Sequence, residues 1–225
     1  MKKIVLLSGG IDSTTCLALA MQGEDPSEVM AVNIFYGQKH KREMESARKV
    51  AAHYGVGLIE LDLEPIFSKS NCSLLAGSTA EIPHESYAEQ QKKTGGKPVS
   101  TYVPFRNGLM LSAAASIALS VGASEVYYGA HADDAAGNAY PDCSEIFTEA
   151  IDLAIREGTA NMVKVIAPLV SKTKAQVVKL GTELDAPHEL TWSCYEGGEH
   201  PCGKCGTCID RKKAFEANGL EDPVE

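Results

Sequence analysis

The sequence predicts an α/β fold, in which a doubly wound parallel sheet is followed by a small cysteine-rich segment at the C-terminus. Short apolar runs alternate with helical patterns along most of the chain, which favours parallel strands with helices on both faces. A Ser-Gly-Gly turn directly follows the first apolar run, at the end of a strand where such sheets bind ligands. Four of the seven cysteines crowd into the segment between residues 194 and 208.

The expected strands are short apolar segments. The first, Ile-Val-Leu-Leu at residues 4–7, ends at the Ser-Gly-Gly turn. The others are expected at residues 29–35, 58–63, 125–128 and 163–166. Because ligands bind at the carboxyl ends of parallel strands, we expect Ser8, Tyr36 and His131 to line one crevice.

The expected helices lie between these strands. Residues 39–54 form a charged amphipathic pattern with methionine, alanine and valine on one face, and Gly55 stands just past its end. Residues 107–121 are rich in alanine, leucine and serine, so a mostly buried helix is expected there. The other helices are expected at residues 12–21, 143–158 and 174–184.

The chain length favours one full domain with a small appendage. We expect a nucleotide-binding α/β domain at residues 1–188 and a four-cysteine segment with a short helix at residues 189–225. Residues 71–100 break the alternation, because they are polar, weakly periodic and contain Gly95-Gly96. A loop of this length predicts a mobile lid over the site, with an inert surface insertion as the alternative.

Composition excludes several classes of protein. The net charge of −9 and the pI of about 5.2 argue against a large nucleic-acid surface, which requires a basic footprint. No apolar run approaches the length of a membrane span, and the run at residues 4–7 is too short for a signal peptide. We therefore expect a cytoplasmic protein with no nucleic-acid or membrane partner.

The segment Ser8–Thr14 predicts a phosphate-binding loop. It joins a strand to a helix, and its two glycines let the backbone approach a ligand closely. Unpaired N–H groups at the helix start attract anions, while Ser8, Ser13 and Thr14 add hydroxyl donors. Asp12 suits an N-cap. The plain alternative is a glycine-rich turn without a ligand.

The spacing Cys194-x7-Cys202-x2-Cys205-x2-Cys208 predicts a metal site. Four thiolates suit one tetrahedral Zn²⁺ ion, and a site closed by four sulfurs is structural rather than catalytic. An iron–sulfur cluster is the rival interpretation, and disulfides are less consistent with a reducing compartment. His200 could replace one ligand, although four cysteines leave no vacancy.

Six motifs in order extend over nearly the whole chain. They are Ser8–Thr14, Tyr36–His40, Val103–Asn107, Tyr140–Cys143, Thr191–Tyr195 and Cys202–Arg211. The first resembles the pyrophosphate loop of the N-type ATP pyrophosphatases, and the ordered set resembles the 7-cyano-7-deazaguanine synthases. The resemblance implies an adenine nucleotide alpha hydrolase-like fold. It also implies ATP-dependent conversion of 7-carboxy-7-deazaguanine and ammonia to the 7-cyano product, through an adenylated intermediate and an amide.

The resemblance implies one structural zinc per chain, Mg²⁺ with ATP, and a homodimer. Asp12, Ser13 and Lys172 are the expected catalytic residues, and Lys174 is a second lysine that could stabilise transition-state charge. The expected ATP-binding residues are Leu7, Ser8, Gly9, Gly10, Ile11, Asp12, Ser13, Thr14, Thr15, Cys16 and Leu17.

A further set of polar residues follows the strand ends or the cysteines and could bind phosphate or the substrate. The set comprises Lys39, His40, Arg42, Arg106, Asn107, His131, Asp133, Tyr140, Asp142 and Arg211. Asp142 could accept hydrogen bonds from the base, and Arg211 could point back toward the crevice. His131, Asp133 and Asp134 could order the ring, bind Mg²⁺ or cap the turn.

Other functions remain open at this point. A tRNA thiolation enzyme would share the pyrophosphate loop, but it needs a reactive cysteine and an RNA-binding surface. Another ammonia-dependent amidating ligase would act on a different acid. A non-catalytic nucleotide-binding module would bind ATP without turning it over.

Overall fold

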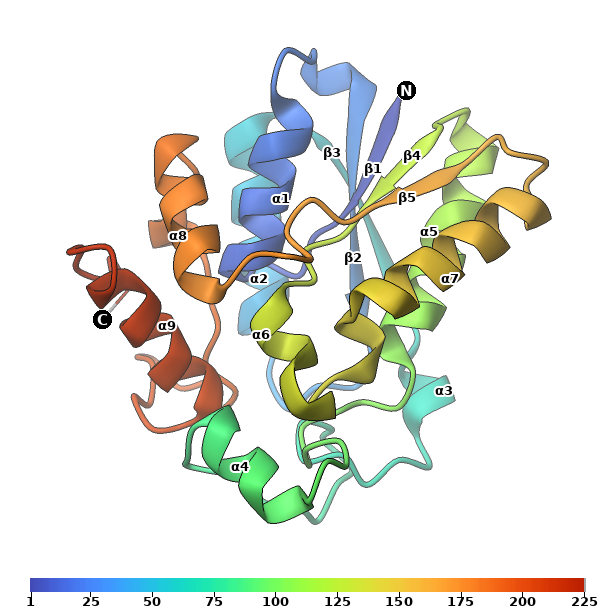
Figure 1. Cartoon of the computed structure of the whole chain (residues 1–225). Coiled ribbons are helices and arrows are strands. Elements are labelled where there is room, and N and C mark those ends of the chain that lie inside the picture. Colours follow the sequence, from blue (N-terminus) through green and yellow to red (C-terminus); the bar gives the residue numbers. More distant parts are fainter. Residues whose placement is uncertain (225) are drawn as a thin grey trace.

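The computed structural model describes residues 1–224. Its centre is a five-stranded parallel sheet with the strand order β3-β2-β1-β4-β5 (Figure 1). All five expected strands are confirmed, with ends shifted by about one residue. Their bounds are β1 Lys3–Leu6, β2 Val29–Phe35, β3 Gly57–Asp62, β4 Glu125–Tyr127 and β5 Lys164–Ile166.

The strand order reverses direction between β1 and β4, which makes their carboxyl ends the switch point of the sheet. The chain builds outward from β1 to β3 and then returns to the other side of β1 as β4. Diverging connections leave a crevice at such a point, so the fold itself places a ligand site beside the loop that follows β1.

Helices cover both faces of the sheet. The larger helices are α1 Ile11–Met21, α2 Arg42–Tyr54, α5 Arg106–Val121, α7 Glu145–Gly158 and α8 Lys174–Glu183. One core cluster joins α1, α2 and α8 to the sheet through Leu17, Val50 and Val177, and another joins α5 and α7 through Leu111 and Ile155. Figure 1 shows the two groups on opposite sides of the strands.

Two helices begin later than predicted, each for a local reason. The helix expected from Lys39 begins at Arg42, because the N–H of Lys39 donates to the carbonyl of Leu74 and ties this stretch to the insertion. The helix expected from Cys143 begins at Glu145, because Ser144 caps it by accepting from the N–H of Phe147 at 3.1 Å.

The insertion at residues 71–100 is more ordered than its polar composition suggests. Leu74 and Leu75 are buried in a cluster with Tyr36, which anchors the start of the segment to the domain. A capping box between Ser86 and Glu89 starts the next helix of the segment. The short elements here and elsewhere are α3 Glu64–Phe67, α4 Tyr87–Thr94, α6 Ala132–Ala135, η1 Pro26–Glu28, η2 Ala136–Asn138, η3 Pro141–Cys143 and η4 His188–Leu190.

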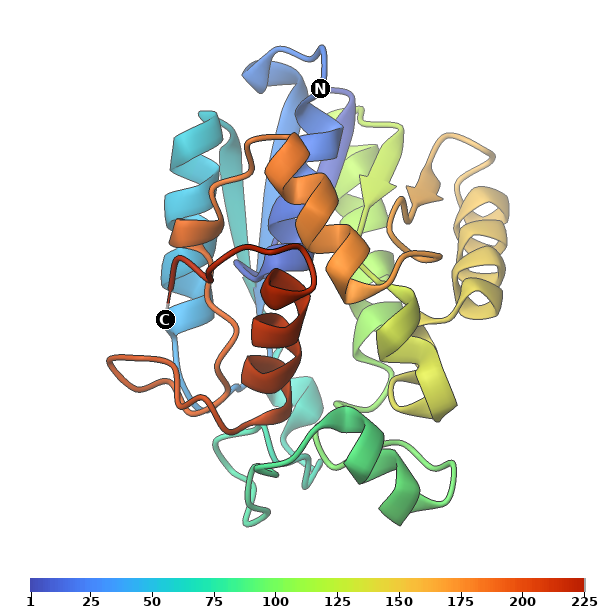
Figure 2. The ribbon, with the colours of Figure 1, turned by 60° about the vertical axis from the view of Figure 1, so that its left-hand side comes forward.

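The cysteine segment packs on the domain through helix α9, Gly206–Glu216. Ala214 and Phe215 of α9 belong to the same buried cluster as Val177 of α8, and the two helices lie side by side (Figure 2). Upstream, the N–H of Trp192 donates to the carbonyl of Gly9 at 2.9 Å. The division at residue 188 therefore stays a prediction about sequence organisation, since the two parts share one core.

Among residues 1–224, no helix combines the length and apolar character that crossing a membrane requires.

Candidate active site

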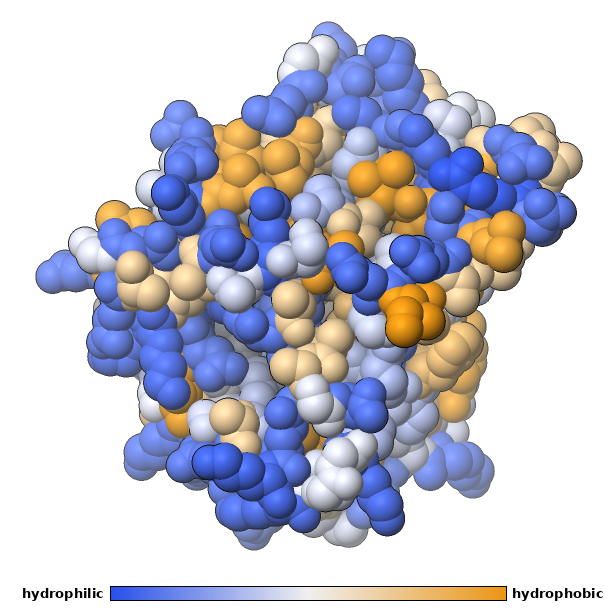
Figure 3. Space-filling view, viewed as in Figure 1, coloured by the Kyte–Doolittle hydropathy of each residue, from blue (hydrophilic) through white to orange (hydrophobic). Residues whose placement is uncertain are grey.

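A cavity of about 570 Å³ opens at the carboxyl ends of β1, β2 and β4. Ser8, Tyr36 and His131 all line it, as expected from the positions of these residues after the strands. Helix α4, the cysteine segment and the first residues of α5 and α8 form the other walls, so the cavity is lined by stretches far apart in the chain. Figure 3 shows the surface hollowed between α4, α6 and α9.

The loop after β1 is built for close backbone contact. Gly9 has φ +89, and a Cβ there would lie 2.3 Å from the carbonyl oxygen of Glu43 and 2.6 Å from the nitrogen of Ala47. Only glycine therefore fits between the loop and α2. Helix α1 has its N-cap at Gly10 and no side-chain cap, so the prediction that Asp12 caps it is wrong. The first N–H groups of α1 stay available to an anion.

Two serines hold the shape of this loop. Their hydroxyl oxygens, Ser8 Oγ and Ser13 Oγ, lie 3.0 Å apart, and Ser13 Oγ donates to the carbonyl of Gly10 at 3.1 Å. The loop residues that face the cavity are Leu7, Ser8, Gly10, Asp12 and Ser13. The side chains of Ile11, Thr14, Thr15, Cys16 and Leu17 are fully buried in the core and do not line the cavity.

An ion pair lies on the wall of the cavity. Lys174 Nζ lies 2.7 Å from Asp12 Oδ1 and 2.5 Å from Oδ2, and both side chains are mostly buried. Burial alone would raise the pKa of Asp12, but Lys174 and His131 hold that pKa below its usual value. The carboxylate is therefore ionised over the neutral pH range, and Lys174 is positioned for phosphate charge.

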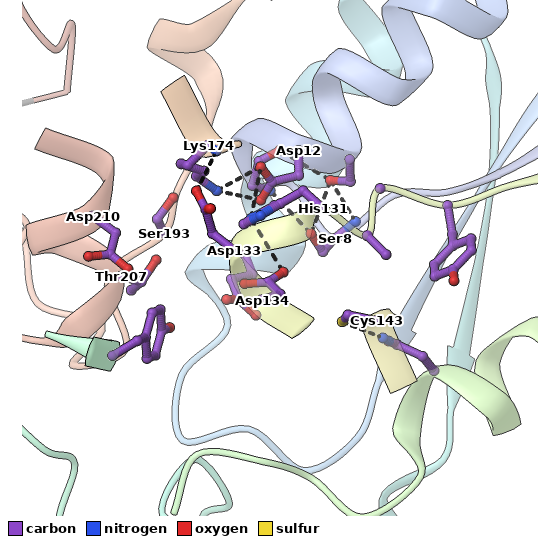
Figure 4. Close-up of a pocket in the computed structure, with 18 of the residues that line it drawn as sticks. Ser8, Asp12, His131, Asp133, Asp134, Cys143, Lys174, Ser193, Thr207 and Asp210 are labelled. Atoms are coloured by element: carbon purple, nitrogen blue, oxygen red, sulfur yellow. Dashed lines mark hydrogen bonds and ion pairs between the residues drawn. The ribbon is translucent and has the colours of Figure 1, made fainter. Parts of the chain in front are cut away.

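His131 links two carboxylates beside this pair. Its Nε2 lies 3.3 Å from Asp134 Oδ2 and 3.7 Å from Asp12 Oδ1, and the ring is 4% exposed. Burial and the nearby Asp12 raise the pKa of Asp134, which His131 partly offsets. Asp133 accepts from the N–H of Lys174 at 2.7 Å. Figure 4 shows Asp12, Asp133 and Asp134 converging around His131.

Lys172 takes no part in this arrangement. Its side chain does not line the cavity, while its backbone carbonyl accepts from the N–H of Ala132 at 2.9 Å. The two lysines bracket the N-cap of α8, and only Lys174, inside the helix, faces Asp12.

A second group of cavity residues surrounds Arg106, the first residue of α5. Its guanidinium lies 4.8 Å from the ring centroid of Tyr36, and it forms no ion pair with any residue in the described chain. Burial opposes its charge, but the neighbouring Tyr36, Asp142 and Glu43 raise its pKa further. Glu43, in the first turn of α2, lines the same cavity, and burial raises its pKa to about 7 despite Arg106.

Asn107 and Asp142 lie behind this group. The N–H of Asn107 donates to Asp142 Oδ2 at 2.9 Å, and Asn107 Nδ2 donates to the carbonyl of Asp142 at 3.0 Å. Asp142 therefore caps α5 and lines a small side cavity of about 70 Å³ instead of the main one. Tyr140 also faces the side cavity, where its hydroxyl lies 2.6 Å from Thr101 Oγ1.

The four cysteines form a compact candidate metal site at the edge of the molecule. The Sγ atoms of Cys194, Cys202, Cys205 and Cys208 all lie within 4.8 Å of one another. Cys205 Sγ is 3.4 Å from Cys208 Sγ, and Cys208 sits in the first turn of α9. The set brings four donors to one point, as the sequence spacing predicted.

Comparison with known proteins agrees with this geometry. The family described as "Queuosine biosynthesis protein QueC" matches residues 2–219. The chain belongs to the QueC family. It is 45% identical to the 7-cyano-7-deazaguanine synthase of Archaeoglobus fulgidus, across 100% of this chain and 90% of the relative. It is 41% identical to that of Oceanobacillus iheyensis, across 100% and 97% of the two chains.

Solved structures of other enzymes share the fold of this QueC chain. They include an NMN synthetase from Francisella tularensis, with a TM-score of 0.53 and 17% identity, over 98% of this chain and 78% of that one. Another is the U34-tRNA thiolase NcsA from Methanococcus maripaludis with its [4Fe-4S] cluster. It has a TM-score of 0.51 and 18% identity, over 97% of this chain and 67% of that one. At these identities the likeness shows the fold alone.

Several basic residues predicted for the QueC site lie outside the cavity. Lys39 Nζ donates to the carbonyl of Ala80 at 3.2 Å, and the Arg42 guanidinium lies 5.5 Å from the ring centroid of Trp192. His40 packs against Gly197, and burial lowers the pKa of its imidazole. His40 and Arg42 join the start of α2 to the cysteine segment, whereas Lys39 joins it to the insertion.

The expectation that Arg211 points into the crevice is wrong. Arg211 is 4% exposed, and its Nε and Nη2 donate to Asp222 at 2.6 and 2.8 Å. Its Nη1 donates to Thr191 Oγ1 at 2.8 Å. Arg211 therefore fastens the segment around Asp222 to α9, and the residues of α9 that line the cavity are Thr207, Asp210, Lys213 and Ala214.

Sequence reasoning missed part of the QueC cavity wall. Ser193 and Tyr195 flank the first cysteine of a motif that was recognised, and that position alone could have indicated them. Glu43 has no such signal, because one acidic residue in a charged helix resembles any other. Other wall residues that were missed are Tyr87, Gln91, Thr207, Asp210 and Lys213.

The pKa of Glu43 predicts how stability depends on pH. Its folded-state pKa of about 7 lies above the usual 4.5, so between these pH values the folded protein binds a proton that the unfolded chain has released. The free energy of unfolding therefore falls as the pH rises through this window. Glu43→Gln removes the titration. The melting temperature of the variant, relative to the wild type, should therefore rise between about pH 5 and about pH 8. A difference that stays constant in thermal melts across that range would contradict the prediction.

Proposed function

We propose that this cavity converts 7-carboxy-7-deazaguanine and ammonia into 7-cyano-7-deazaguanine at the expense of ATP. Family membership identifies a 7-cyano-7-deazaguanine synthase of queuosine biosynthesis, an ATP-dependent enzyme that acts on small molecules. The observation that carries the assignment to this site is the Asp12–Lys174 pair beside the Ser8–Ser13 loop. It lies in a cavity large enough for a nucleotide and a bicyclic base.

The chemistry explains why the site needs a phosphate loop. A carboxylate does not react with ammonia at neutral pH, because oxide would have to leave. Attack of the carboxylate on the α-phosphate forms an acyl-adenylate and releases pyrophosphate. The N–H groups at the start of α1 and the Ser8 and Ser13 hydroxyls hold the departing pyrophosphate. Lys174 offsets the charge that develops on it.

The second stage uses the same machinery. Ammonia displaces AMP from the adenylate and forms the amide. Activation of the amide oxygen by ATP, followed by loss of the activated group and of the remaining N–H protons, gives the nitrile. His131, between Asp12 and Asp134, is placed to take up and return protons.

The lack of a reactive thiol among the described cavity residues favours this reaction over thiolation. The cysteine outside the metal set that lines the cavity is Cys143, whose Sγ accepts from Asn107 Nδ2 at 3.2 Å. Burial raises the pKa of the Cys143 thiol, which suppresses the reactive thiolate. Cys16 and Cys72 are buried elsewhere.

We also propose that Asp12, Asp133 and Asp134 hold the Mg²⁺ that accompanies ATP. Carboxylate oxygens are the ligands Mg²⁺ prefers, and these three converge beside the loop. The ion would neutralise phosphate charge and favour in-line geometry. Lys174, which bonds to Asp12, would supply a second positive charge at the same site.

The metal held by the cysteines is proposed to be a structural zinc ion. Four sulfurs around one zinc lie about 3.8 Å apart, since each Zn–S bond is about 2.3 Å long. The separations of 3.4 Å for Cys205–Cys208 and 4.0 Å for Cys202–Cys208 lie close to this value. A four-iron cluster holds its thiolates farther apart, because each sulfur binds a different iron atom. Zinc content of about one per chain after purification tests the proposal.

A homodimer is proposed through the outer face of α7. Ile146 and Leu153 lie two turns apart on this helix and are 80% and 60% exposed. Figure 3 shows hydrophobic side chains on the surface over α7. Burying such residues is the main driving force of association.

Replacing Ile146 and Leu153 together with aspartate should convert the dimer to a monomer. Light scattering is expected to give twice the chain mass of 24.0 kDa for the wild type and a single chain mass for the variant. Ile66→Asp is the control, since Ile66 is 58% exposed on α3. A wild type that is monomeric at micromolar concentration would refute the proposal.

One assay tests the proposed function directly. The purified protein is incubated with 7-carboxy-7-deazaguanine, ATP, Mg²⁺ and ammonium, and base and nucleotide products are identified by mass spectrometry. We expect the nitrile together with AMP and pyrophosphate. Release of ADP would place cleavage at the wrong phosphate, and an unchanged base would refute the substrate.

A further inference from the structure

Several charged side chains of the cavity form no ion pair with any residue among 1–224, and two of them, Glu43 and Arg106, act on each other. Glu43 and Arg106 both line it, and neither forms an ion pair with the other or with any residue among 1–224. They nevertheless lie close enough to influence each other, because Arg106 lowers the pKa of Glu43 and Glu43 raises that of Arg106. A carboxylate and a guanidinium that face one cavity without touching leave room for a ligand between them.

Both residues are held firmly beside the phosphate loop. The backbone of Glu43 packs against Gly9, where a Cβ would be 2.3 Å from the Glu43 carbonyl oxygen. Arg106 begins α5 and stacks on Tyr36, directly after β2. Asp142 and Asn107 fix the start of the same helix. The two charges are therefore preorganised at a defined place next to the site of adenylation.

The other carboxylates of the cavity belong to its phosphate end. Asp12 bonds to Lys174, and Asp133 accepts from the backbone of the same lysine. Asp134 lies against His131. The Asp210 side chain has no hydrogen-bonding partner among residues 1–224, but the charges that act on it include those of Lys174, Asp134 and Asp133 at the phosphate end. Glu43 is the carboxylate of the main cavity that acts on Arg106, while Asp142, which also acts on Arg106, lies in the side cavity and accepts from the N–H of Asn107.

The guanine-type edge of the substrate has the complementary pattern. N1–H and the 2-amino group are adjacent donors that one carboxylate can accept together, as carboxylates accept from paired donors elsewhere. The 6-oxo oxygen is an acceptor beside them, and it adjoins the 7-carboxyl group on the ring. A guanidinium, with five N–H donors in a fixed fork, can contact both of these oxygens.

We propose that Glu43 and Arg106 bind this edge of the deazapurine: Glu43 accepts from N1–H and the 2-amino group, and Arg106 donates to the 6-oxo oxygen. The proposal rests on the proposed function, whose substrate carries that edge. It makes Glu43 the residue that selects a 2-aminopurine-type acid over an acid without the amino group.

A comparison of two substrates in three enzymes tests the proposal. The substrates are 7-carboxy-7-deazaguanine and its analogue lacking the 2-amino group, and the quantity measured is the ratio of their kcat/KM values. The enzymes are the wild type, Glu43→Gln, and Glu45→Gln as the matched control. Glu45 lies on the same helix, is exposed and does not line the cavity. ATP is saturating, and its KM is measured in parallel.

The wild type should prefer the aminated substrate by roughly 10- to 100-fold, the effect of one hydrogen bond to a charged group. Glu43→Gln should reduce this ratio to near unity and leave the KM for ATP unchanged. Glu45→Gln should keep the wild-type ratio. If Glu43→Gln does not fold, Glu43→Asp, which retains the charge but draws it back by one methylene, carries the same comparison and should lower the ratio.

Two results would overturn the proposal. A Glu43→Gln enzyme that is slower on both substrates but keeps the wild-type ratio would overturn the proposal, because the carboxylate would then serve a step common to both. A wild type that discriminates poorly would also overturn it. A wild type that turns over neither substrate would instead refute the proposed function, so the two failures are distinguishable.

Discussion

Lys174→Gln is expected to lower kcat by roughly 100- to 1000-fold, the usual cost of removing one group that stabilises charge in a transition state. Glutamine retains an amide donor for Asp12, so the buried carboxylate keeps a hydrogen bond and the fold should survive. What is lost is the positive charge 2.5 Å from Asp12 Oδ2, which we propose offsets the charge of the departing pyrophosphate. Single-turnover release of pyrophosphate measures the effect on adenylation itself.

Lys172→Gln provides the matched control for that experiment. Lys172 has the same charge and lies just outside α8, but its side chain is not on the cavity wall. Its replacement should change kcat by no more than about threefold, as is usual for a residue remote from the reacting atoms. If Lys172→Gln were as damaging as Lys174→Gln, or more so, the assignment of Lys174 would be wrong.

Removing the metal is expected to have the largest effect on stability. Cys205→Ser, or treatment of the wild type with a strong zinc chelator, should lower the melting temperature by roughly 10 °C or more, because binding free energy at a structural zinc site is folding free energy. The loss should spread beyond the segment, since α9 places Ala214 and Phe215 in the core with Val177.

Chelator sensitivity separates loss of the metal from loss of a buried thiol. Cys72→Ala removes a cysteine that is also buried but lies outside the cluster. This variant should lose some stability and still respond to the chelator, whereas Cys205→Ser should no longer respond. A wild type whose melting temperature is indifferent to chelation would contradict a structural role for the ion.

The features that sequence predicted well have local signals. Apolar runs indicated the five strands, the glycine turn indicated the loop, and the x2 spacings indicated the cysteine cluster, because each pattern lies within a few consecutive residues. Membership of the cavity wall was predicted less well. Lys172 and Lys174 stand on either side of the N-cap of α8, and only the side chain of Lys174 points into the cavity. The order of residues in the sequence does not show in which direction each side chain points.

Arg211 and Glu43 also show that sequence patterns do not predict membership of the cavity wall: Arg211 was expected there and is absent, whereas Glu43 was not expected and is present. Arg211 follows the cysteine motif, yet Asp222, eleven residues later, draws its guanidinium away from the cavity. Glu43 resembles the other acidic residues of its helix, and only the approach of Gly9 and Arg106 makes it a cavity residue. Both outcomes depend on contacts between distant segments, which the sequence of either segment alone does not contain.

Contacts at one side of the cavity link helix α4 to the cysteine segment. Helix α4 meets the cysteine segment through the Tyr87 and Tyr195 hydroxyls, 2.6 Å apart, and the loop before α4 meets it through His84 Nε2, 2.8 Å from Glu196 Oε1. A neutral hydrogen bond contributes about 1 kcal/mol, and an exposed ion pair adds little. Packing adds to these bonds, because Ile82 lies against the cysteine cluster and Gly206 of α9 lies against Gln90 and Tyr87. The position of α4 beside the cavity therefore depends on the folded cysteine segment, not on the hydrogen bonds alone.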